Sequence, residues 1–462
     1  MPLYRSKPAR SVRGEIFLPG DKSIAHRSII ISAIARGKTN IYNFPTSQDC
    51  RVTLSAFKKL GIRISRVVRI NSHINLCVEG RGLHGLRKSS TDIYVRESGT
   101  TTRLILGVLA GQRFSTSLTA GGSLTHRPMR RVTEPLRRMG AIIKAQSAKK
   151  PGRTLRHVIE EYLPITIKGG GLHGIRYKMP VASAQVKSAL LLAGLYARGT
   201  TKIFEPIKTR DHTERMLRDF GADIKVKGKI ILLNGQKELV SPKKIEIPGD
   251  ASSASFLMAA AILLPNSRLV LKSVGINPSR FGLIPVLKRM GANIKIISIK
   301  SSTCAGEPVG HIIITSSNLR GTEVNSSEVP QLIDELPILM LVSCYARGRT
   351  IIYGIEELRV KETDRIEAMQ TNLRKMGAEI YVASYRSGSR RLREKIIIQG
   401  IGQLKGARVS SFADHRIAMS MIIARLVCSG QVLIDDVGCI AKSFPDFLNV
   451  LKRVVKKTHT FL

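Results

Sequence analysis

The chain of 462 residues lacks tryptophan and is poor in other aromatic residues, with 12 Phe and 10 Tyr. So few aromatic rings leave little surface for stacking on nucleic acid bases. No apolar run approaches the roughly 18–20 residues that a membrane span needs. The basic start of the chain has no apolar segment typical of a secretion signal. We therefore expect a soluble, cytoplasmic protein.

The six cysteines, at positions 50, 77, 304, 344, 428 and 439, have no C-x-x-C or other metal-binding spacing. Several lie in apolar segments, so we expect reduced, buried thiols rather than a disulfide scaffold. The sequence also lacks a zinc motif, a G-x-G-x-x-G motif and a nucleophile elbow. With 43% apolar and 23% charged residues, the composition excludes collagen and low-complexity disorder and is typical of globular domains.

Acidic residues are scarce, because 33 Asp and Glu face 75 Lys and Arg and give a net charge of +42. Such a balance is typical of proteins that bind nucleic acids, acidic membrane surfaces or small anions. The basic residues are spread along the whole chain, without a nucleic-acid recognition motif. Enrichment of solvated surfaces in Lys and Arg, and attraction of anionic substrates, are both compatible with this distribution. Nucleic-acid binding is the weaker alternative.

Internal repeats account for nearly the whole chain. The phrase Ala-Arg-Gly before an apolar strand recurs at residues 35–37, 197–199 and 346–348. Glycines that fit the residue after a helix end recur at intervals of roughly 70 to 86 residues, at positions 61, 140, 221, 291 and 377. A sixth copy begins at Asp414 and lacks this glycine. We predict six units of about 75 residues, each containing helix, strand, helix and strand.

Two junctions divide the repeats into halves. Leu18-Pro-Gly-Asp-Lys-Ser23 and Ile247-Pro-Gly-Asp-Ala-Ser252 are near copies, in which Pro-Gly breaks regular structure and Asp or Ser caps a new helix. They predict two lobes, one of residues 21–247 and one of residues 1–20 plus 248–462. Residues 1–18 would then pair with the C-terminal lobe. Two ordinary loops are the alternative.

Several helix starts in the N-terminal half carry residues suited to anions. Lys22, Ser23 and Arg27 open the first helix, where backbone N–H groups and a planar guanidinium can hold phosphate or carboxylate. A capped helix with a solvent-facing cation is the alternative. Ser98-Gly-Thr-Thr-Thr-Arg103 resembles a phosphate cradle without P-loop spacing, although such residues also make plain helix caps. Further candidates are Arg127, Ser183, Ala184, Gln185 and Arg210.

The C-terminal half supplies acids for proton transfer. Asp334 precedes a very apolar helix and is either a cap or a base at the edge of a cleft. Lys361 and Arg365 form a like-charge pair four residues apart, which an isolated helix disfavours and a bound anion would explain. Glu362 lies beside them and could move a proton. A solvated charged face is the alternative for this segment. Arg416 and Lys442 complete the candidates.

If the two lobes face one another, these helix starts converge on one cleft rich in Lys and Arg. The motifs in their order resemble the EPSP synthase family from about residue 3 to residue 455. The resembling segments are Leu18–Arg27, Ser98–Arg103, Arg127-Pro128, Ser183–Gln185, Arg359–Arg365 and Asp414–Met419.

The resemblance implies an α/β fold of two similar lobes, each of three βαβαββ repeat units, known as an inside-out α/β barrel. It implies transfer of the enolpyruvyl group of phosphoenolpyruvate to the 5-hydroxyl of shikimate 3-phosphate, without a metal or organic cofactor. The implied partners are these two small anions, not nucleic acid or membrane, and the implied state is a monomer.

The resemblance also implies roles for individual residues. Asp334 would take the hydroxyl proton, Glu362 would serve the methylene carbon, and Lys22 is a third catalytic residue. Shikimate 3-phosphate would contact Lys22, Ser23, Arg27, Ser183, Ala184, Gln185, Arg210, Asp334 and Lys361. Phosphoenolpyruvate would contact Lys22, Gly99, Arg127, Gln185, Arg365, Arg416 and Lys442.

One position departs from the family, because Glu97 stands where these proteins usually have Asn. An acid beside an anion site is unfavourable unless Arg96 or another cation pairs with it. Gly99, on which glyphosate access depends in the family, is present, so we expect inhibition by glyphosate.

Two other families share this architecture. UDP-N-acetylglucosamine 1-carboxyvinyltransferases typically have Lys-Asn where this chain has Lys22-Ser23, and they use a loop cysteine that is missing from residues 119–127. RNA 3′-phosphate cyclases need a catalytic histidine motif that we do not find. From a different class, a basic nucleic-acid-binding protein is favoured only by the net charge.

Overall fold

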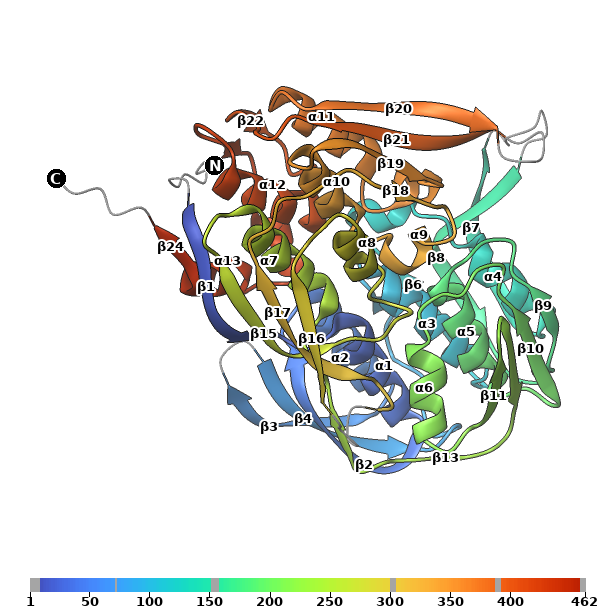
Figure 1. Cartoon of the computed structure of the whole chain (residues 1–462). Helices are drawn as coiled ribbons and strands as arrows, with labels where there is room; N and C mark the ends of the chain where they lie inside the picture. Colours follow the sequence, from blue (N-terminus) through green and yellow to red (C-terminus); the bar gives the residue numbers. More distant parts are fainter. Residues whose placement is uncertain (1–8, 71–72, 151–157, 300–304, 387–391, 458–462) are drawn as a thin grey trace. The chain divides into compact units, whose positions relative to one another are not determined.

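The structure is a computed structural model of the chain, and it describes residues 9–70, 73–150, 158–299, 305–386 and 392–457 (Figure 1). The chain divides into two compact units. The N-terminal unit comprises residues 20–247 and the segment that ends at Glu307. The C-terminal unit comprises the described parts of residues 1–19, 248–301 and 308–462. Residues 1–8 and Cys304, for which the sequence made predictions, lie outside the described residues.

Helices and strands alternate in the N-terminal unit. Its elements are α1 (Lys22–Ala33), β2 (Ala35–Pro45), α2 (Gln48–Lys59), β3 (Arg63–Ile70), β4 (His73–Arg81), β5 (Ile93–Tyr94), α3 (Gly99–Leu109), β6 (Ser115–Thr119), η1 (Gly122–His126), α4 (Arg130–Arg138), β7 (Ile142–Lys150), β8 (Val158–Lys168), β9 (Arg176–Lys178), α5 (Ala184–Gly194), β10 (Thr200–Phe204), α6 (His212–Asp219), β11 (Asp223–Lys227), β12 (Ile230–Asn234), β13 (Leu239–Val240) and β14 (Lys244–Glu246).

The C-terminal unit repeats this order. Its elements are β1 (Ala9–Phe17), α7 (Ala251–Leu263), β15 (Arg268–Gly275), α8 (Leu283–Arg289), β16 (Ile294–Ile299), β17 (Val309–Thr315), β18 (Glu323–Val324), α9 (Val329–Leu332), α10 (Leu336–Cys344), β19 (Gly348–Tyr353), η2 (Glu356–Val360), α11 (Arg365–Lys375), β20 (Glu379–Arg386), β21 (Leu392–Gly400), β22 (Arg408–Val409), α12 (His415–Val427), β23 (Leu433–Ile434), η3 (Gly438–Lys442), α13 (Phe447–Val454) and β24 (Val455–Lys457).

One sheet pattern recurs through the chain. A short strand pairs in parallel with the strand after the first helix, and two antiparallel strands follow, as in the order β5-β6-β8-β7. The orders β9-β10-β12-β11 and β18-β19-β21-β20 repeat it. The prediction of an α/β fold built from repeats is therefore confirmed. Within the described residues, none of the sheets closes on itself as a barrel.

The strand before each Pro-Gly junction pairs with a strand of the unit that does not contain the next helix. β1 precedes α1 in sequence, yet it pairs in parallel with β15 of the C-terminal unit, where Arg13 lies opposite Arg268. β14 precedes α7 in sequence, yet it pairs in parallel with β2 of the N-terminal unit, where Lys244 lies opposite Asn40. Each unit therefore completes its first sheet with a strand that the chain supplies from the other side of a junction.

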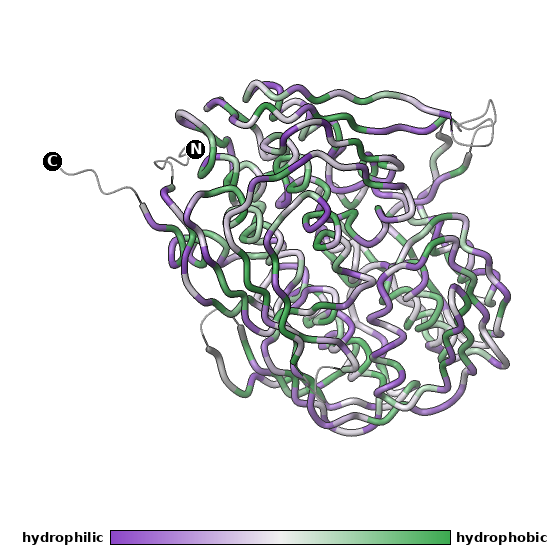
Figure 2. Tube along the Cα trace, viewed as in Figure 1, coloured by the Kyte–Doolittle hydropathy of each residue, from purple (hydrophilic) through white to green (hydrophobic). Residues whose placement is uncertain are grey.

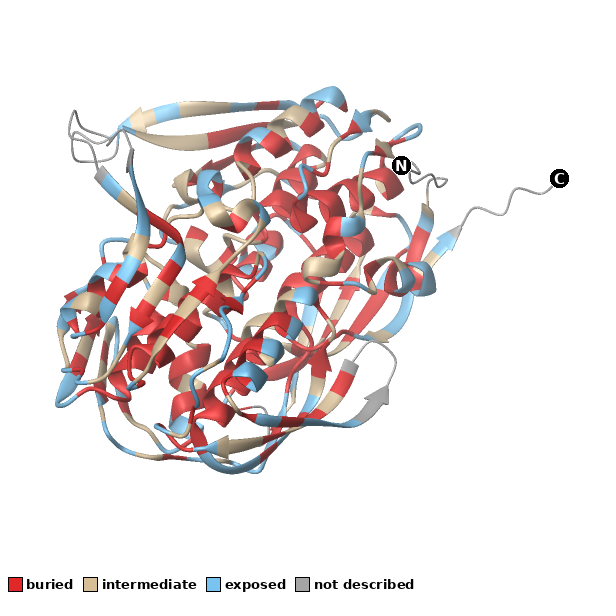
Figure 3. Ribbon diagram, turned by 180° about the vertical axis from the view of Figure 1, so that it is seen from behind, coloured by how far each residue is buried: buried red, intermediate tan, exposed pale blue. Residues whose placement is uncertain are grey.

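The first helix of each repeat forms the core. In the N-terminal unit α3 packs against α1 and α5, and in the C-terminal unit α12 packs against α7 and α10. Nearly every residue of these helices is buried, as Figure 3 shows for the central helices. The strands instead mix hydrophobic and hydrophilic residues along their length (Figure 2), because one face covers the helices and the other meets solvent.

The recurrent glycines end the second helix of each repeat. All five adopt positive φ angles, from +81° at Gly221 to +114° at Gly140, directly after the helix C-cap. This left-handed conformation costs glycine little and strains other residues. The predicted repeat ends at residues 61, 140, 221, 291 and 377 are confirmed.

The described cysteines are free thiols, as predicted. Cys50, Cys344, Cys428 and Cys439 are buried, whereas Cys77 is only partly so. Burial raises the pKa of Cys50, Cys344 and Cys439 to about 12, so these thiols stay protonated and unreactive near neutral pH.

Candidate functional site

The start of α1 holds cations in fixed positions. Asp21 caps the helix, because its Oδ1 accepts the backbone N–H of Ile24 at 2.9 Å. The Nζ of Lys22 lies 2.9 Å from the carboxylate of Asp49. Both observations agree with the predicted helix start, where backbone N–H groups of the first turn are suited to an anion.

Arg27 is buried one turn further along α1. Its guanidinium donates to Thr213 at 2.7 Å, to Ser188 at 2.8 Å and to the backbone oxygen of Ser23 at 2.8 Å. Burial, together with the smaller effect of the Arg210 charge, lowers the pKa of Arg27 to about 10, although the carboxylate of Glu214 opposes this shift. The side chain therefore remains a cation at neutral pH and joins α1 to α5 and α6.

Gly99 at the start of α3 lies close to the side chain of Arg127. A Cβ atom built on Gly99 would lie 3.1 Å from Nη1 of Arg127 and 2.7 Å from Nη1 of Arg103. The same Nη1 of Arg103 donates to Oε1 of Gln185 at 2.9 Å. The motif of residues 98–103 includes Arg103 but indicates no role for it. Its position between two predicted ligands could not be read from sequence spacing.

Glu97 anchors the loop that carries Arg127. Its Oε1 accepts the backbone N–H of Ser123 at 2.9 Å and the hydroxyl of Ser123 at 3.2 Å. The sequence predicts that Arg96 or another cation balances this acid. In the structure, the partners of Glu97 include the backbone N–H of Ser123, in the first turn of η1. The carboxylate therefore serves to hold the loop of residues 122–127.

A buried ion cluster connects α5 to α6 and to the end of β10. Lys187 is inaccessible to solvent, and its Nζ lies 3.0 Å from Glu205 and 2.7 Å from Glu214. Glu205 also accepts the backbone N–H of Thr209 at 3.1 Å, which fixes the residue preceding Arg210. Burial raises the pKa of Glu214 despite the neighbouring Lys187. These acids were not identified from the sequence.

In the C-terminal unit, Arg365 gathers three carboxylates. Its guanidinium lies 2.8 Å from Asp414, 2.6 Å from Glu362 and 3.6 Å from Asp334. Burial alone would lower the pKa of Arg365, and the three acids more than offset it, so the pKa is raised. Asp334 and Glu362, the two predicted proton carriers, are thus held by one cation.

The interpretation of Lys361 and Arg365 as a helical pair is wrong. Lys361 is the residue directly after η2, and the next helix, α11, begins only at Arg365. Lys361 is therefore not part of a helix with Arg365. Asp364 explains the boundary, because its side chain accepts the backbone N–H groups of Ile366 and Glu367 and so caps α11. The like-charge argument for a bound anion therefore does not apply here.

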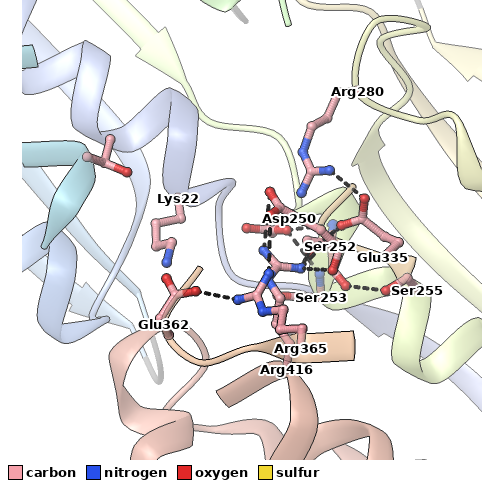
Figure 4. A network of polar contacts seen from close by, with 12 residues as sticks. Lys22, Asp250, Ser252, Ser253, Ser255, Arg280, Glu335, Glu362, Arg365 and Arg416 are labelled. Atoms are coloured by element: carbon pink, nitrogen blue, oxygen red, sulfur yellow. Dashed lines mark hydrogen bonds and ion pairs between the residues drawn. The ribbon is translucent and has the colours of Figure 1, made fainter. Parts of the chain in front are cut away.

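Arg416 lies in the first turn of α12. Asp414 caps this helix, because its Oδ1 accepts the backbone N–H of Arg416 at 2.8 Å. Its Nη1 donates to the backbone oxygen of Asp334 at 2.7 Å, and its Nη2 lies 3.7 Å from the Asp334 carboxylate. Figure 4 shows Arg365 and Arg416 side by side in this network. The Nζ of Lys442 donates to the backbone oxygen of Ala413 at 3.3 Å, close to the same helix start.

Each unit thus holds its own group of predicted residues. Ser183 caps α5 through the backbone N–H of Val186, and Ala184 and Gln185 form its first turn. Arg210 lies in the loop before α6. The arginines and helix starts are suited to phosphate and carboxylate groups, and the paired acids are suited to proton transfer.

The described residues offer neither a candidate membrane helix nor a candidate metal cluster. None of their helices combines the length and apolar character of a membrane span. In the same part of the chain, no three His, Cys, Asp or Glu side chains gather closely enough to hold a metal ion.

Comparison with known proteins relates the chain to one family. The sequence model of EPSP synthase (3-phosphoshikimate 1-carboxyvinyltransferase) matches residues 6–451. The chain is 44% identical over 455 residues to the 3-phosphoshikimate 1-carboxyvinyltransferase of Geotalea uraniireducens, covering 98% of this chain and all of the relative. It is also 44% identical to the enzyme of that name from Oceanobacillus iheyensis, covering 98% of this chain and 100% of the relative.

Solved structures agree. The EPSP synthase of Acinetobacter baumannii has a TM-score of 0.81 and 39% identity, with 98% of both chains covered. The enolpyruvyl transferase NikO from Streptomyces tendae has a TM-score of 0.73 at 16% identity, covering 98% of this chain and 97% of NikO, which supports the fold alone.

Proposed function

The chain belongs to the EPSP synthase (3-phosphoshikimate 1-carboxyvinyltransferase) family, and we propose which of its residues carry out each part of that reaction. As such a transferase, it moves the enolpyruvyl group of phosphoenolpyruvate to the 5-hydroxyl of shikimate 3-phosphate and releases phosphate. This step belongs to the shikimate pathway to chorismate and the aromatic amino acids. The assignment of residues rests on their positions and on the chemistry of two highly anionic substrates.

Shikimate 3-phosphate is bound mainly by the N-terminal unit. The buried cation Arg27 and the helix starts of α1 and α5 support this role, because phosphate is stabilised by guanidinium groups and by backbone N–H groups at helix N-termini. The proposed ligands are Lys22, Ser23, Arg27, Ser183, Ala184, Gln185, Arg210, Asp334 and Lys361.

Phosphoenolpyruvate is bound by arginines of both units. Within the N-terminal unit, the close approach of Arg127 to Gly99 supports this role. Within the C-terminal unit, the fixed guanidinium groups of Arg365 and Arg416 support it. Neutralising the phosphate and carboxylate of this substrate favours departure of phosphate. The proposed ligands are Lys22, Gly99, Arg127, Gln185, Arg365, Arg416 and Lys442.

Two acids move the protons. Asp334 takes the proton of the attacking 5-hydroxyl, and Glu362 transfers a proton to and from the methylene carbon of the enolpyruvyl group. The oxygen attacks C2 while Glu362 protonates the methylene carbon. Loss of phosphate and return of a methyl proton to Glu362 then restore the double bond, and the hydroxyl proton taken by Asp334 goes to the released phosphate. Lys22 stabilises negative charge on the reacting groups. The observation that carries this proposal is the single guanidinium of Arg365, which holds both acids, at 3.6 and 2.6 Å.

Phosphate release from phosphoenolpyruvate tests the reaction. We expect release only when shikimate 3-phosphate is present, with formation of an equal amount of the enol ether. A purified protein that releases no phosphate with both substrates would contradict the function. Binding of random DNA at about 150 mM salt would favour the nucleic-acid alternative, since nonspecific contacts weaken steeply with salt.

We also propose a cytoplasmic monomer that glyphosate inhibits. The buried thiols are consistent with a reducing compartment, and all the proposed ligands lie on one chain. Cell fractionation and sedimentation velocity test location and oligomeric state. A periplasmic protein or a stable dimer would contradict these two statements.

A further inference from the structure

Glu335 is a buried carboxylate that no proposed substrate role uses. It precedes α10 directly, yet its side chain makes no capping hydrogen bond to that helix. Its Oε2 accepts Nη1 of Arg280 at 2.8 Å, and its Oε1 accepts the hydroxyl of Ser252 at 2.5 Å (Figure 4). The Nη1 of Arg416 lies 3.3 Å from the same Oε1. Both oxygens of this acid are therefore engaged.

These contacts join separate elements of the C-terminal unit. Ser252 belongs to the first turn of α7, Arg280 to the loop between β15 and α8, and Arg416 to the first turn of α12. Ser252 also donates its hydroxyl to Glu335 while it accepts a hydrogen bond from Arg416. The carboxylate of Glu335 thus connects the start of its own helix, α10, to the starts of α7 and α12, and these three buried helices belong to three different repeats.

The internal repeat shows what is unusual here. Ser252 occupies the position in Pro-Gly-Asp-Ala-Ser that Ser23 occupies in Pro-Gly-Asp-Lys-Ser of the N-terminal unit. We assign Ser23 to the phosphate of a substrate, whereas the hydroxyl of Ser252 binds a carboxylate of the protein itself. In the C-terminal unit, Glu335 takes the place that an anionic ligand has at the equivalent helix start.

We propose that Glu335 is a positioning residue, the internal counter-anion that orients the guanidinium of Arg416 and the neighbouring Asp334 for phosphoenolpyruvate. Arg416 commits Nη1 to Ser252, Glu335 and the backbone of Asp334, which fixes the plane of its guanidinium. Removing the carboxylate of a buried ion pair leaves the charge of the cation uncompensated, so we expect the guanidinium of Arg416 to leave this orientation. This inference rests on the proposed role of Arg416 in binding phosphoenolpyruvate.

Kinetics of Glu335→Gln and Glu335→Ala test the proposal. We expect kcat/KM for phosphoenolpyruvate to fall by about tenfold or more, because a charged partner of Arg416 is lost, while KM for shikimate 3-phosphate stays within about twofold. Glu328→Ala is the matched control. Glu328 lies in the same unit and pairs with Arg289 at 3.1 Å, but that pair is exposed, so its removal leaves both constants unchanged.

Formate and acetate provide a readout that a merely structural role would not move. In Glu335→Ala, either anion can occupy the vacated space between Arg280 and Ser252, so we expect it to restore part of the lost kcat/KM for phosphoenolpyruvate. Neither anion is expected to stimulate the wild type or Glu328→Ala. Glu335→Gln keeps the side-chain shape and decides the question if the alanine variant does not fold.

Two results would overturn the proposal. One is an unchanged kcat/KM for phosphoenolpyruvate in a folded Glu335 variant. The other is an equal loss for both substrates without recovery in formate or acetate, which would indicate a purely structural role. A wild-type protein without turnover would contradict the proposed function and the inference together, whereas normal wild-type turnover with insensitive Glu335 variants would contradict the inference alone.

Discussion

Arg365 and Asp414 form an ion pair from which solvent is excluded, with 2.8 Å between Nε and the carboxylate and side-chain exposures of 1% and 0%. Asp414 also caps α12 through the backbone N–H of Arg416. A single buried acid thus holds one proposed ligand of phosphoenolpyruvate and sets the backbone of another.

Replacing this acid is expected to cost both stability and activity. Asp414→Ala removes a buried charge partner and a helix cap, and we expect the free energy of unfolding to fall by about 3–5 kcal/mol. Glu394→Gln is the control, because Glu394 lies 2.8 Å from Arg359 in an exposed pair and should cost less than about 1 kcal/mol. Urea unfolding measures both, and equal losses in the two variants would contradict the account.

Glu214 is expected to make stability depend on pH. Burial raises the pKa of Glu214 in the folded state above its pKa in the unfolded chain. The protonated side chain therefore contributes fully to stability at pH values below the unfolded-state pKa, and this contribution is lost as the pH rises through the folded-state pKa. Glu214→Gln lacks this titration. The unfolding free energy of the variant minus that of the wild type should therefore increase from pH 4.5 to pH 8. Urea titrations at several pH values check this, and a difference that stays constant or decreases would show that burial does not govern this acid.

Gly99→Ala is expected to weaken binding of phosphoenolpyruvate without unfolding the protein. The new Cβ would approach Nη1 of Arg103 to 2.7 Å, and this flexible end can shift. Displacement of Arg103 and Arg127 should raise KM for phosphoenolpyruvate by about tenfold, with a smaller effect on shikimate 3-phosphate.

The same variant addresses glyphosate. We expect the inhibitor to act on the wild type and to act less on Gly99→Ala. Steady-state kinetics with and without the inhibitor measure both effects. Wild-type activity that is unaffected by millimolar glyphosate at low phosphoenolpyruvate, or an unchanged KM in the variant, would contradict the assignment of Gly99.

Glu97 is expected to act through the loop that it anchors. Glu97→Ala leaves the backbone N–H of Ser123 without this acceptor and should loosen residues 122–127, so KM for phosphoenolpyruvate should rise several-fold, by roughly 1 kcal/mol of binding. Glu97→Gln keeps an acceptor oxygen and should remain close to the wild type. If both variants raise KM equally, the carboxylate charge rather than the loop contact matters.

Local features of the fold could be predicted from the sequence. The glycines after the second helices and the caps Asp21 and Asp250 follow from backbone conformation and hydrogen bonding within a few residues. The prediction of a helical pair at Lys361 and Arg365 was wrong because it relied on the spacing of the two charges. The N-cap Asp364 is a local signal that places the start of the helix at Arg365, four residues after Lys361.

Contacts between distant residues could not be predicted in this way. Lys187 and Glu205 are 18 residues apart, and Glu335 and Arg280 are 55 residues apart. Neither pair belongs to a motif with a fixed spacing, and Glu335 looks in sequence like a helix cap. Tertiary packing places these charges together, within one repeat for Lys187 and Glu205 and between two repeats for Arg280 and Glu335. The ions that support the proposed ligands are therefore revealed by the tertiary structure.

We propose that residues of both units serve a single reaction. Single-turnover phosphate release by Asp334→Ala and by Lys22→Met, with both substrates saturating and unfolding temperatures matched to the wild type, tests it directly. We predict that each folded variant loses at least about 99% of the wild-type rate, equivalent to roughly 2.7 kcal/mol of transition-state stabilisation. A fully active Asp334→Ala enzyme would contradict the claim.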